Sequence, residues 1–383
     1  MHRRVVAVEV HPGDLSPVAA ALDGSGPALA PLRPGGEPPA GVTVPDGVAL
    51  VVTTSGSTGE PRAVLLDEAA LRASAEATHD RLGGPGRWLL TLPLHHVAGL
   101  QVVVRSLLSG HDPFAVPAAG SFDAVQVAAA LAALPAELRP RYGSVVPTQL
   151  HRIVECSPRD VRPWADLDAI LVGGAPATPA LLERARTAGL RVVTTYGSTE
   201  TSGGCVYDGL PLSGTRVRTD EGGVVHLAGP TLARGYLDRP DLDAVAFVEH
   251  EGVRWFRTGD LGEVRDGVLR VHGRADDVVV TGGVKVAPAA VEAALAALPG
   301  VAQVCVVGVP DEEWGQLVVA VLVPTAAGRA PRLDEVRDVV RRTLGAAAAP
   351  RRVVLTDALP ERGPGKVDRA AVAVLAATDP PRR

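Results

Sequence analysis

The segment from Thr53 to Arg62 combines hydroxyl side chains with two glycines directly after an apolar run, residues 48–52. That apolar run is typical of a buried strand. Glycine allows positive φ, so successive backbone N–H groups can converge on an anion, and the hydroxyls add further donors. No lysine followed by serine or threonine stands after the second glycine, so the segment is not a Walker P-loop. It predicts a phosphate-binding loop, with an ordinary surface turn as the alternative.

A second polar segment follows the apolar residues 191–195 and reads Tyr196-Gly197-Ser198-Thr199-Glu200. An aromatic ring can stack on a purine, a hydroxyl can reach a phosphate, and a carboxylate can hold Mg²⁺ directly or through water. A turn of small residues, 173–176, follows another apolar strand, and such a turn lets a flat ligand approach the backbone. The residue types of both segments are compatible with a flat, phosphate-bearing ligand, although a plain strand crossover also explains the turn.

Lysine is rare in this chain: of the 38 basic residues only Lys285 and Lys366 are lysines. Arginine serves nearly everywhere else, so a retained lysine indicates a place where a compact, rotatable ammonium matters. Chance retention is the alternative. Lys366 stands between a loop rich in proline and glycine and an expected helix.

The length of 383 residues allows a substantial core and two domains. The net charge of −5 comes from interspersed acidic and basic residues, which argues against nucleic-acid binding. The three cysteines, Cys156, Cys205 and Cys305, lie far apart, so we expect neither a zinc site nor disulfides, and a reducing, cytoplasmic setting. Glu9 interrupts the first apolar run, and no uncharged run approaches the ~18 residues of a membrane span.

The sequence also predicts secondary structure outside these motifs. Residues 1–45 predict a strand, a short helix and a long irregular connection. Short strands and turns from 223 to 271 predict a small β-rich subdomain. Helices are expected at 122–134, 178–188, 288–298 and 333–344, and strands at 304–309 and 318–323.

These motifs, in this order, resemble those of the adenylate-forming acyl- and aryl-CoA synthetase superfamily. The superfamily's phosphate loop reads Thr-Ser-Gly-Ser-Thr-Gly-x-Pro-Lys, and here the last position is Arg62, which keeps the charge without the ammonium geometry. The resemblance covers most of the chain and implies an α/β fold in two domains. Residues 1–275 would form an adenylation core of stacked α/β subdomains plus a β-rich subdomain, shorter before the phosphate loop than in typical members. Residues 276–383 would form a small mobile α+β domain that swings about a hinge at Asp276.

The resemblance also assigns roles to single residues. The nucleotide site would comprise the phosphate loop, the adenine turn, the second polar segment and two ribose or phosphate contacts: Thr54, Ser55, Gly56, Ser57, Thr58, Gly59, Gly174, Ala175, Pro176, Tyr196, Gly197, Asp260 and Arg274. Catalysis is assigned to His96, Thr199, Glu200 and Lys366, with Glu200 as the Mg²⁺ ligand. Gly283 and Lys285 would meet the CoA arm and the nucleotide phosphate in a second half-reaction.

The acid substrate would lie near two further motifs. In Pro93-Leu94-His95-His96 the resemblance places His96 in the acyl pocket, and no carboxylate stands there to pair with the ammonium of an amino acid. Val146-Pro147-Thr148-Gln149-Leu150-His151-Arg152 resembles the substrate-side helix of the o-succinylbenzoate–CoA ligases of menaquinone biosynthesis, in which the matching arginine lies near the distal carboxylate. An arginine fork can hold a carboxylate bidentately. The expected acid site is His96, Ser144, Thr148 and Arg152, whereas simple helix capping with a solvated Arg152 is the alternative.

The function implied is an ATP-dependent acid–CoA ligase with ATP, Mg²⁺ and CoA, most like an o-succinylbenzoate–CoA ligase. Its partners would be small molecules, namely an aromatic or acyl carboxylic acid, ATP and CoA, and the resemblance leaves a homodimer open. One alternative is an adenylating enzyme that loads a carrier-protein thiol, which presents the same phosphopantetheine arm. Another is a nucleotide-binding pseudoenzyme, which the short N-terminal part and Arg62 would favour, while Glu200, Asp260 and Lys366 argue against it.

Overall fold

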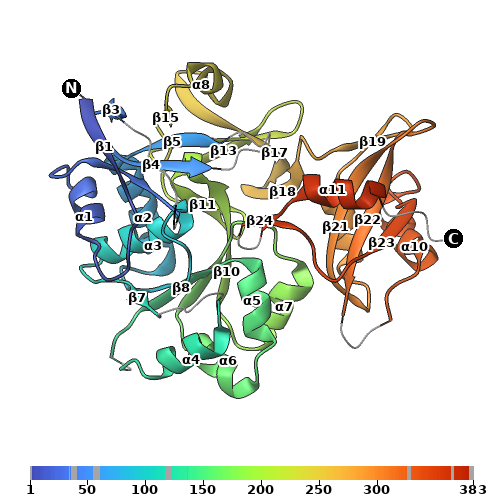
Figure 1. Cartoon of the computed structure of the whole chain (residues 1–383), viewed down its shortest axis with the longest axis horizontal. Coiled ribbons are helices and arrows are strands. Elements are labelled where there is room, and N and C mark those ends of the chain that lie inside the picture. Colours follow the sequence, from blue (N-terminus) through green and yellow to red (C-terminus); the bar gives the residue numbers. More distant parts are fainter. Residues whose placement is uncertain are drawn as a thin grey trace.

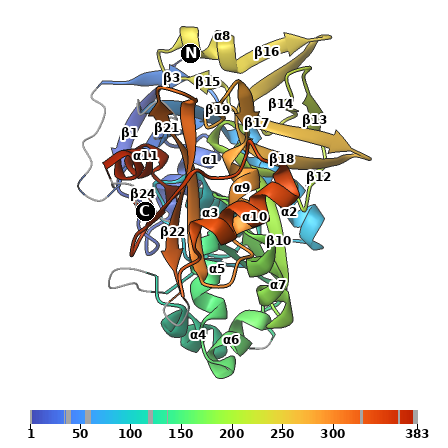
Figure 2. The same ribbon diagram turned by 90° about the vertical axis from the view of Figure 1, so that its right-hand side faces the viewer.

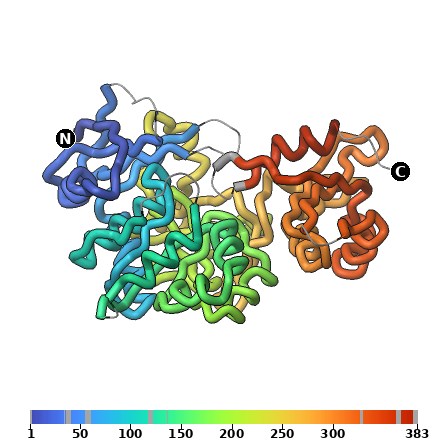
Figure 3. Tube along the Cα trace, turned by 60° about the horizontal axis from the view of Figure 1, so that its bottom comes forward, coloured from blue at the N-terminus to red at the C-terminus, as the bar shows by residue number. Residues whose placement is uncertain are grey.

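The structure is a computed structural model that describes residues 2–33, 35, 41–54, 61–116, 122–135, 137–325, 329–363 and 366–378. The side chains of Arg362 and Lys366 are outside the described part. The elements form a larger lobe and, beside it, a smaller lobe built from the C-terminal residues (Figures 1 and 3).

The first sheet of the larger lobe has the strand order β15-β5-β4-β2-β1-β3. Its strands are β1 (His2–Val8), β2 (Ala28–Pro31), β3 (Thr43–Pro45), β4 (Val48–Thr54), β5 (Arg62–Asp67) and β15 (Gly235–Tyr236). Strands β1, β2 and β4 are parallel, whereas β5 returns antiparallel to β4. The predicted phosphate loop therefore stands in the sequence between β4 and β5, two neighbouring antiparallel strands.

The second sheet has the order β12-β11-β10-β9-β8-β6-β7. Its strands are β6 (Arg87–Leu90), β7 (Phe114–Ala115), β8 (Arg141–Val145), β9 (Ala169–Val172), β10 (Val192–Ser198), β11 (Gly203–Tyr207) and β12 (Leu210–Pro211). Strands β6 to β10 are parallel. From β6 the chain continues to β7 on one side, whereas from β8 it continues to β9 and β10 on the other. The carboxyl ends of β6 and β8 thus form a topological switch point, where open α/β sheets bind ligands.

Helices fill the space between the two sheets and cover the second sheet from outside (Figure 1). Helices α1 (Ser16–Leu22), α2 (Glu68–Leu82) and α3 (Val97–Leu108) lie between the sheets. Residues 102–104 of α3 are completely buried, because both sides of this helix meet apolar neighbours. The outer face of the second sheet carries α4 (Ala124–Ala132), α5 (Pro147–Val154), α6 (Pro158–Ala165) and α7 (Pro179–Thr187).

A β-rich subdomain completes the larger lobe. Its sheet has the order β13-β14-β17-β16, with β18 also paired to β17. The elements are β13 (Arg216–Thr219), β14 (Val224–Ala228), α8 (Pro240–Ala246), β16 (Phe247–His250), β17 (Val253–Arg265) and β18 (Val268–Arg274). A short turn of 3-10 helix, η1 (Thr199–Thr201), follows β10.

The smaller lobe is an α+β unit with helices on both faces of a sheet (Figure 2). Its strands are β19 (Val279–Thr281), β20 (Val284–Val286), β21 (Val301–Asp311), β22 (Gly315–Pro324), β23 (Arg352–Leu355), β24 (Glu361–Gly363) and β25 (Lys366–Val367). Helices α9 (Pro288–Leu295) and α10 (Leu333–Leu344) pack on one face of the β21-β22-β23 sheet, and α11 (Arg369–Thr378) packs on the other. The buried apolar clusters of the larger lobe end at Leu269 and those of the smaller lobe begin at Val279. The domain boundary and hinge at Asp276 stay predictions.

The expected α/β fold class is confirmed, with differences in detail. The helix expected at 333–344 has those bounds, whereas the helix expected at 288–298 ends at Leu295. The described part of the first 45 residues contains three strands and a helix, so this part is more regular than expected. Cys156, Cys205 and Cys305 are free thiols. Over the ranges given above, no helix is both long and apolar enough to span a membrane.

Candidate active site

Tyr196, near the end of β10, and Asp260, in β17, are joined by a short hydrogen bond. The phenol of Tyr196 donates to Oδ2 of Asp260 at 2.7 Å. Arg274 lies opposite Asp260 in the antiparallel register of β17 and β18, with its Nη1 3.4 Å from Asp260 Oδ1. The Nη2 of Arg274 donates to Asp276 Oδ2 at 3.2 Å. The structure therefore brings three predicted nucleotide residues together and connects them to the predicted hinge.

Burial and neighbouring charges keep both Tyr196 and Arg274 protonated. Burial, together with the charge of Asp260, raises the pKa of Tyr196, so its hydroxyl remains a donor. Burial alone would lower the pKa of Arg274, but the carboxylates of Asp260 and Asp276 outweigh it and raise that pKa. Arg274 therefore stays positively charged beside a carboxylate. Such a pair suits a ligand that carries both phosphates, which a guanidinium binds, and hydroxyls, from which a carboxylate accepts hydrogen bonds.

The turn after β9 leaves its backbone open. Gly174 has φ +81°, and the nearest described atom to a Cβ there would be 3.4 Å away. A Cβ on Gly173, in contrast, would lie 2.2 Å from Thr195 Oγ1, so this position requires glycine for packing. Ala175 and Pro176 complete the turn with at least partial exposure. A flat ligand can approach Gly174 without meeting a side chain of the turn.

Glu200 lies in η1, directly after β10, with its carboxylate in a defined orientation. Its Oε1 accepts a hydrogen bond from the Tyr236 hydroxyl at 2.9 Å. Thr199, beside it, is buried. Gly197, predicted to meet the nucleotide, also has a packing reason, since a Cβ there would lie 2.2 Å from the carbonyl oxygen of Gly203.

The two ends of the predicted phosphate loop are held across the β4–β5 pair. Thr54, the last residue of β4, donates through its hydroxyl to the carbonyl of Arg62 at 3.4 Å. The guanidinium carbon of Arg62 lies 5.9 Å from the ring centroid of Tyr236. Because Tyr236 also binds Glu200, the exit of the loop and the predicted metal ligand share one partner. Five predicted phosphate contacts lie outside the described residues: Ser55, Gly56, Ser57, Thr58 and Gly59.

Ser144 and Thr148 lie at the switch point between β6 and β8. Ser144 is buried, and its carbonyl accepts a hydrogen bond from Thr91 Oγ1 at 2.6 Å. The amide of Gln149 donates to the carbonyl of Thr91 at 3.0 Å. These bonds join the carboxyl ends of both strands to the first turn of α5, where Thr148 is half-buried. The predicted acid-binding residues thus border the place where this sheet type binds ligands.

His96 and Arg152 are the exposed members of the predicted acid site. His96 precedes α3, and its ring centroid lies 4.2 Å from that of His95. Burial, and secondarily the charge of Arg33, lowers the pKa of His95. Arg152 lies on the exposed side of α5 and donates to the carbonyl of Phe122 at 3.2 Å. No described hydrogen bond joins Arg152 to the other three predicted residues, so its role stays a prediction.

Arg369 anchors the segment of the predicted catalytic lysine inside the smaller lobe. Lys366 lies in β25, and α11 begins at Arg369. The Arg369 guanidinium reaches Asp277 Oδ2 at 3.0 Å, both oxygens of Glu292 at 2.7 and 2.8 Å, and the carbonyl of Val306 at 2.8 Å. These contacts connect the segment after Lys366 to Asp277, the residue that follows the predicted hinge at Asp276.

The other predicted residues of the smaller lobe, Gly283 and Lys285, lie on the β19–β20 ribbon. Gly283 has φ +77°, and no described atom lies within 4 Å of an added Cβ. Lys285 is exposed on β20, opposite Val280. Both residues are free to meet a ligand or the other lobe.

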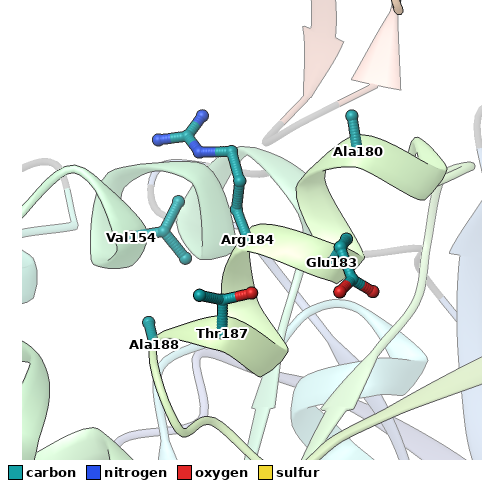
Figure 4. Close-up of a pocket in the computed structure, with 6 residues that line it drawn as sticks. All are labelled: Val154, Ala180, Glu183, Arg184, Thr187 and Ala188. Atoms are coloured by element: carbon teal, nitrogen blue, oxygen red, sulfur yellow. The ribbon is translucent and has the colours of Figure 1, made fainter.

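A surface cavity of about 510 Å³ lies between α5 and α7 (Figure 4). Its lining is Val154, Ala180, Glu183, Arg184, Thr187 and Ala188. Arg184 forms an ion pair with Glu155. No residue predicted for nucleotide or acid binding is among the described lining residues, so this cavity is separate from the candidate active site.

The carboxylate of Glu200 fits magnesium better than a metal that needs a full protein cage. Among the described residues, no group of three or more His, Cys, Asp or Glu side chains could hold a metal ion. Mg²⁺ usually keeps several waters and binds through one or two carboxylates plus substrate phosphates. A single oriented carboxylate, which shares Tyr236 as a partner with Arg62 at the exit of the predicted phosphate loop, fits that requirement.

No role is predicted from the sequence for Tyr236 or Arg369. Tyr236 stands in a Gly-Tyr-Leu segment that reads as structural, and its contact with Glu200 joins β15 of the first sheet to η1, the turn after β10. For Arg369 a signal exists, because it closes the Gly-Lys-Val-Asp-Arg run that contains Lys366.

Fold and site define an adenylate-forming enzyme, and comparison with known families agrees. The chain belongs to the AMP-binding enzyme family: the family's model matches residues 5–237, and that of the AMP-binding enzyme C-terminal domain matches residues 290–366. The predicted superfamily is thereby confirmed.

Three known proteins illustrate the similarity. A protein of Mycobacterium tuberculosis named "Probable 2-succinylbenzoate–CoA ligase" is 47% identical over 335 residues, which cover 87% of this chain and 85% of that protein. The o-succinylbenzoate CoA synthetase of Bacillus subtilis, solved with its acyl-adenylate intermediate, gives a TM-score of 0.74 at 27% identity and covers 88% of this chain and 71% of its own. An amide bond synthetase from Marinactinospora thermotolerans gives 0.77 at 26% identity, with 97% and 79% covered.

Proposed function

We propose that this protein is an ATP-dependent, AMP-forming o-succinylbenzoate–CoA ligase. The observation that carries the proposal is the 47% identity, over most of both chains, to the mycobacterial protein named for this reaction. The likeness to the Bacillus subtilis enzyme, solved with o-succinylbenzoyl-AMP and also with ATP and a magnesium ion, supports ATP, Mg²⁺ and CoA as the cosubstrates and metal.

In the first half-reaction a carboxylate oxygen of the acid attacks the α-phosphorus of ATP. The bond from that phosphorus to the bridging oxygen breaks, and pyrophosphate leaves. The protein positions the reactants and neutralises charge. Tyr196 would stack on adenine, Asp260 would accept the ribose hydroxyls, and the loop after Thr54 would bind the leaving phosphates.

Two cationic centres would offset the repulsion between the reacting anions. Lys366 would bridge the acid carboxylate and the α-phosphate, for which a compact ammonium is suited. Glu200 would hold Mg²⁺, which supplies charge neutralisation at the phosphates when bound.

In the second half-reaction the CoA thiolate attacks the acyl carbon of the adenylate. The bond from that carbon to the phosphate oxygen breaks, AMP leaves, and the thiol proton has passed to solvent. The smaller lobe would first rotate about Asp276, removing Lys366 and bringing Gly283 and Lys285 to the site. The open backbone at Gly283 supports this assignment, because it leaves room for a narrow arm.

The acid would occupy the switch point between β6 and β8. Ser144, Thr148 and His96 would border the acid, and Arg152, on the same helix as Thr148, would pair with its distal carboxylate. Positions 95 and 96 are both histidine, so no carboxylate is present there to pair with the ammonium of an amino-acid substrate.

Free thiols at all three cysteines support a reducing, cytoplasmic setting. A homodimer is the assembly to examine first, by light scattering.

The deciding experiment incubates the protein with Mg²⁺, ATP and CoA in separate tubes containing o-succinylbenzoate, benzoate, a medium-chain fatty acid or an amino acid. Products are identified by mass. We expect o-succinylbenzoyl-CoA in the first tube alone. Acyl-AMP without thioester would indicate a carrier-protein or amine acceptor instead of CoA. No adenylate or thioester in any tube would contradict the proposal and favour a nucleotide-binding pseudoenzyme.

A further inference from the structure

Tyr236 has no role in the scheme above, yet it contacts two parts of the candidate triphosphate site. It lies in the short strand β15, is 4% exposed, and pairs with Val64 of β5. Its hydroxyl donates to Glu200 Oε1 at 2.9 Å. An ionised carboxylate oxygen can only accept, so the phenol of Tyr236 is the donor in this bond.

The ring of Tyr236 meets the exit of the phosphate loop. Arg62 begins β5, and its guanidinium carbon lies 5.9 Å from the ring centroid. A planar guanidinium can stack on an aromatic face, which makes arginine and lysine unequal at such a position. Arg62 stands where the superfamily pattern has lysine, and the ring of Tyr236 gives this chain a partner for the guanidinium.

Tyr236 is itself held from several sides. Its backbone N–H donates to Asp243 Oδ1 at 2.8 Å, and its ring lies 5.8 Å from that of Phe247. A Cβ at Gly235 would approach Asp243 Oδ2 to 2.6 Å, so the neighbouring glycine permits this bond. The backbone N–H of Ala233 donates to the carbonyl of Glu200 at 2.8 Å, which fixes η1 against the same segment.

We propose that Tyr236 is a positioning residue that orients the Glu200 carboxylate toward the metal bound with ATP. The proposal rests on the proposed function, which assigns Glu200 to Mg²⁺. The hydrogen bond from Tyr236 to Oε1 restricts rotation of the Glu200 carboxylate. The lone pairs that this bond does not use are thereby held in one orientation, available to a metal. Partners of this kind, which bind a metal ligand without touching the metal, commonly change metal affinity by about 10- to 100-fold when removed.

The test is the affinity of the purified protein for Mn²⁺, measured by electron paramagnetic resonance in the presence of a non-hydrolysable ATP analogue. Tyr236→Phe keeps the ring and its contact with Arg62 but removes the donor. We expect the Kd for Mn²⁺ to rise about tenfold. The matched control is Tyr207→Phe, because Tyr207 is also buried and its hydroxyl contacts Thr78 and Arg105 instead of the site.

Each outcome of the measurement is informative. Weaker Mn²⁺ binding in Tyr236→Phe, with Tyr207→Phe like the wild type, supports the proposal. Unchanged binding in Tyr236→Phe, or equal weakening in both variants, overturns it. The variant Glu200→Gln separates the two proposals: if it binds Mn²⁺ as the wild type does, the metal assignment itself fails and the Tyr236 proposal with it. The measurement needs neither the acid nor CoA, so it stays valid whatever acid the enzyme uses.

Discussion

The hydroxyl of Tyr196 lies 2.7 Å from Oδ2 of Asp260, so the ring expected at adenine and the carboxylate expected at ribose are directly joined. These residues come from β10 of the second sheet and β17 of the β-rich subdomain. Their contact therefore links two subdomains at the predicted nucleotide site. Arg274 adds a charge on the other oxygen of Asp260, at 3.4 Å.

We predict that Asp260→Asn weakens ATP binding while leaving the acid site intact. The amide keeps the shape but loses the charge and one acceptor, and hydrogen bonds to charged groups contribute about 1.5–3 kcal/mol. The KM for ATP should rise at least about tenfold, with less than about a twofold change for the acid. Asp220→Asn is the matched control, because Asp220 pairs with His226 within the β-rich subdomain. A larger effect on the acid than on ATP would contradict the assignment.

The two lysines should separate the two half-reactions. Lys366→Ala should abolish adenylate formation, measured as pyrophosphate release, but leave thioester formation from pre-made acyl-AMP largely intact, because the proposed rotation removes Lys366 from the site before the second half-reaction. Lys285→Ala should show the reverse pattern. Equal loss of both half-reactions in Lys366→Ala would exclude the proposed rotation about Asp276.

The sequence predicts those parts of the candidate site that depend on residues close together in the chain. A motif in which neighbouring residues constrain one another can be recognised from the sequence. In Pro93-Leu94-His95-His96-Val97-Ala98-Gly99 the glycine is required, because a Cβ on Gly99 would lie 2.3 Å from the carbonyl oxygen of Pro93. The turn at Gly173 and Gly174 is likewise visible, since one position excludes a side chain and the other has positive φ.

Contacts between distant segments are not visible in the sequence. Tyr236 and Glu200 are separated by 36 positions and Arg369 and Glu292 by 77, and each pair joins elements whose packing no periodicity specifies. β15 has only two residues, too few for an alternating pattern. The end of α9 at Leu295 was also not predictable, because the alanine-rich sequence after it is compatible with more helix.

Arg152→Leu should affect recognition of a dicarboxylate acid more than of ATP. The substitution removes a guanidinium that can bind a distal carboxylate bidentately, a contact of about 1.5–3 kcal/mol. We expect the KM for o-succinylbenzoate to rise about tenfold or more and the KM for ATP to stay within about twofold. Arg162→Leu, on the exposed surface of the neighbouring α6, serves as the control. An unchanged KM for the acid would remove Arg152 from the acid site.

Arg369→Met should destabilise the smaller lobe. It leaves Asp277 and Glu292, whose side chains are 28% and 17% exposed, without their shared cation. Stripping one partner from a partly buried charge cluster costs on the order of 2 kcal/mol. Hydrogen exchange followed by mass spectrometry should show faster exchange in β21 and α9. Arg332→Met is the matched control in the same lobe, because its ion pair with Asp334 is exposed and should contribute less than about 1 kcal/mol.

His79 should make the stability of the larger lobe depend on pH. It is 7% exposed in the last turn of α2, and burial, followed by the charge of Arg105, lowers its pKa from 6.5 to about 4. The folded protein holds this imidazole neutral, whereas the unfolded chain takes up a proton below about pH 6.5. Stability is therefore fully present above pH 6.5 and falls as the pH drops toward 4, below which both states are protonated.

The loss attributable to His79 is on the order of 2 kcal/mol once partial solvation is allowed for. Urea unfolding followed by tryptophan fluorescence between pH 7.5 and 4.5 measures it, since Trp88 lies 6.3 Å from the imidazole between ring centroids. His79→Gln should flatten the decline, while the same replacement at the exposed His272 controls for the substitution itself. If His79→Gln declines as steeply as the wild type, the acid sensitivity of the larger lobe arises from other groups, the carboxylates paired with arginine being the first to examine.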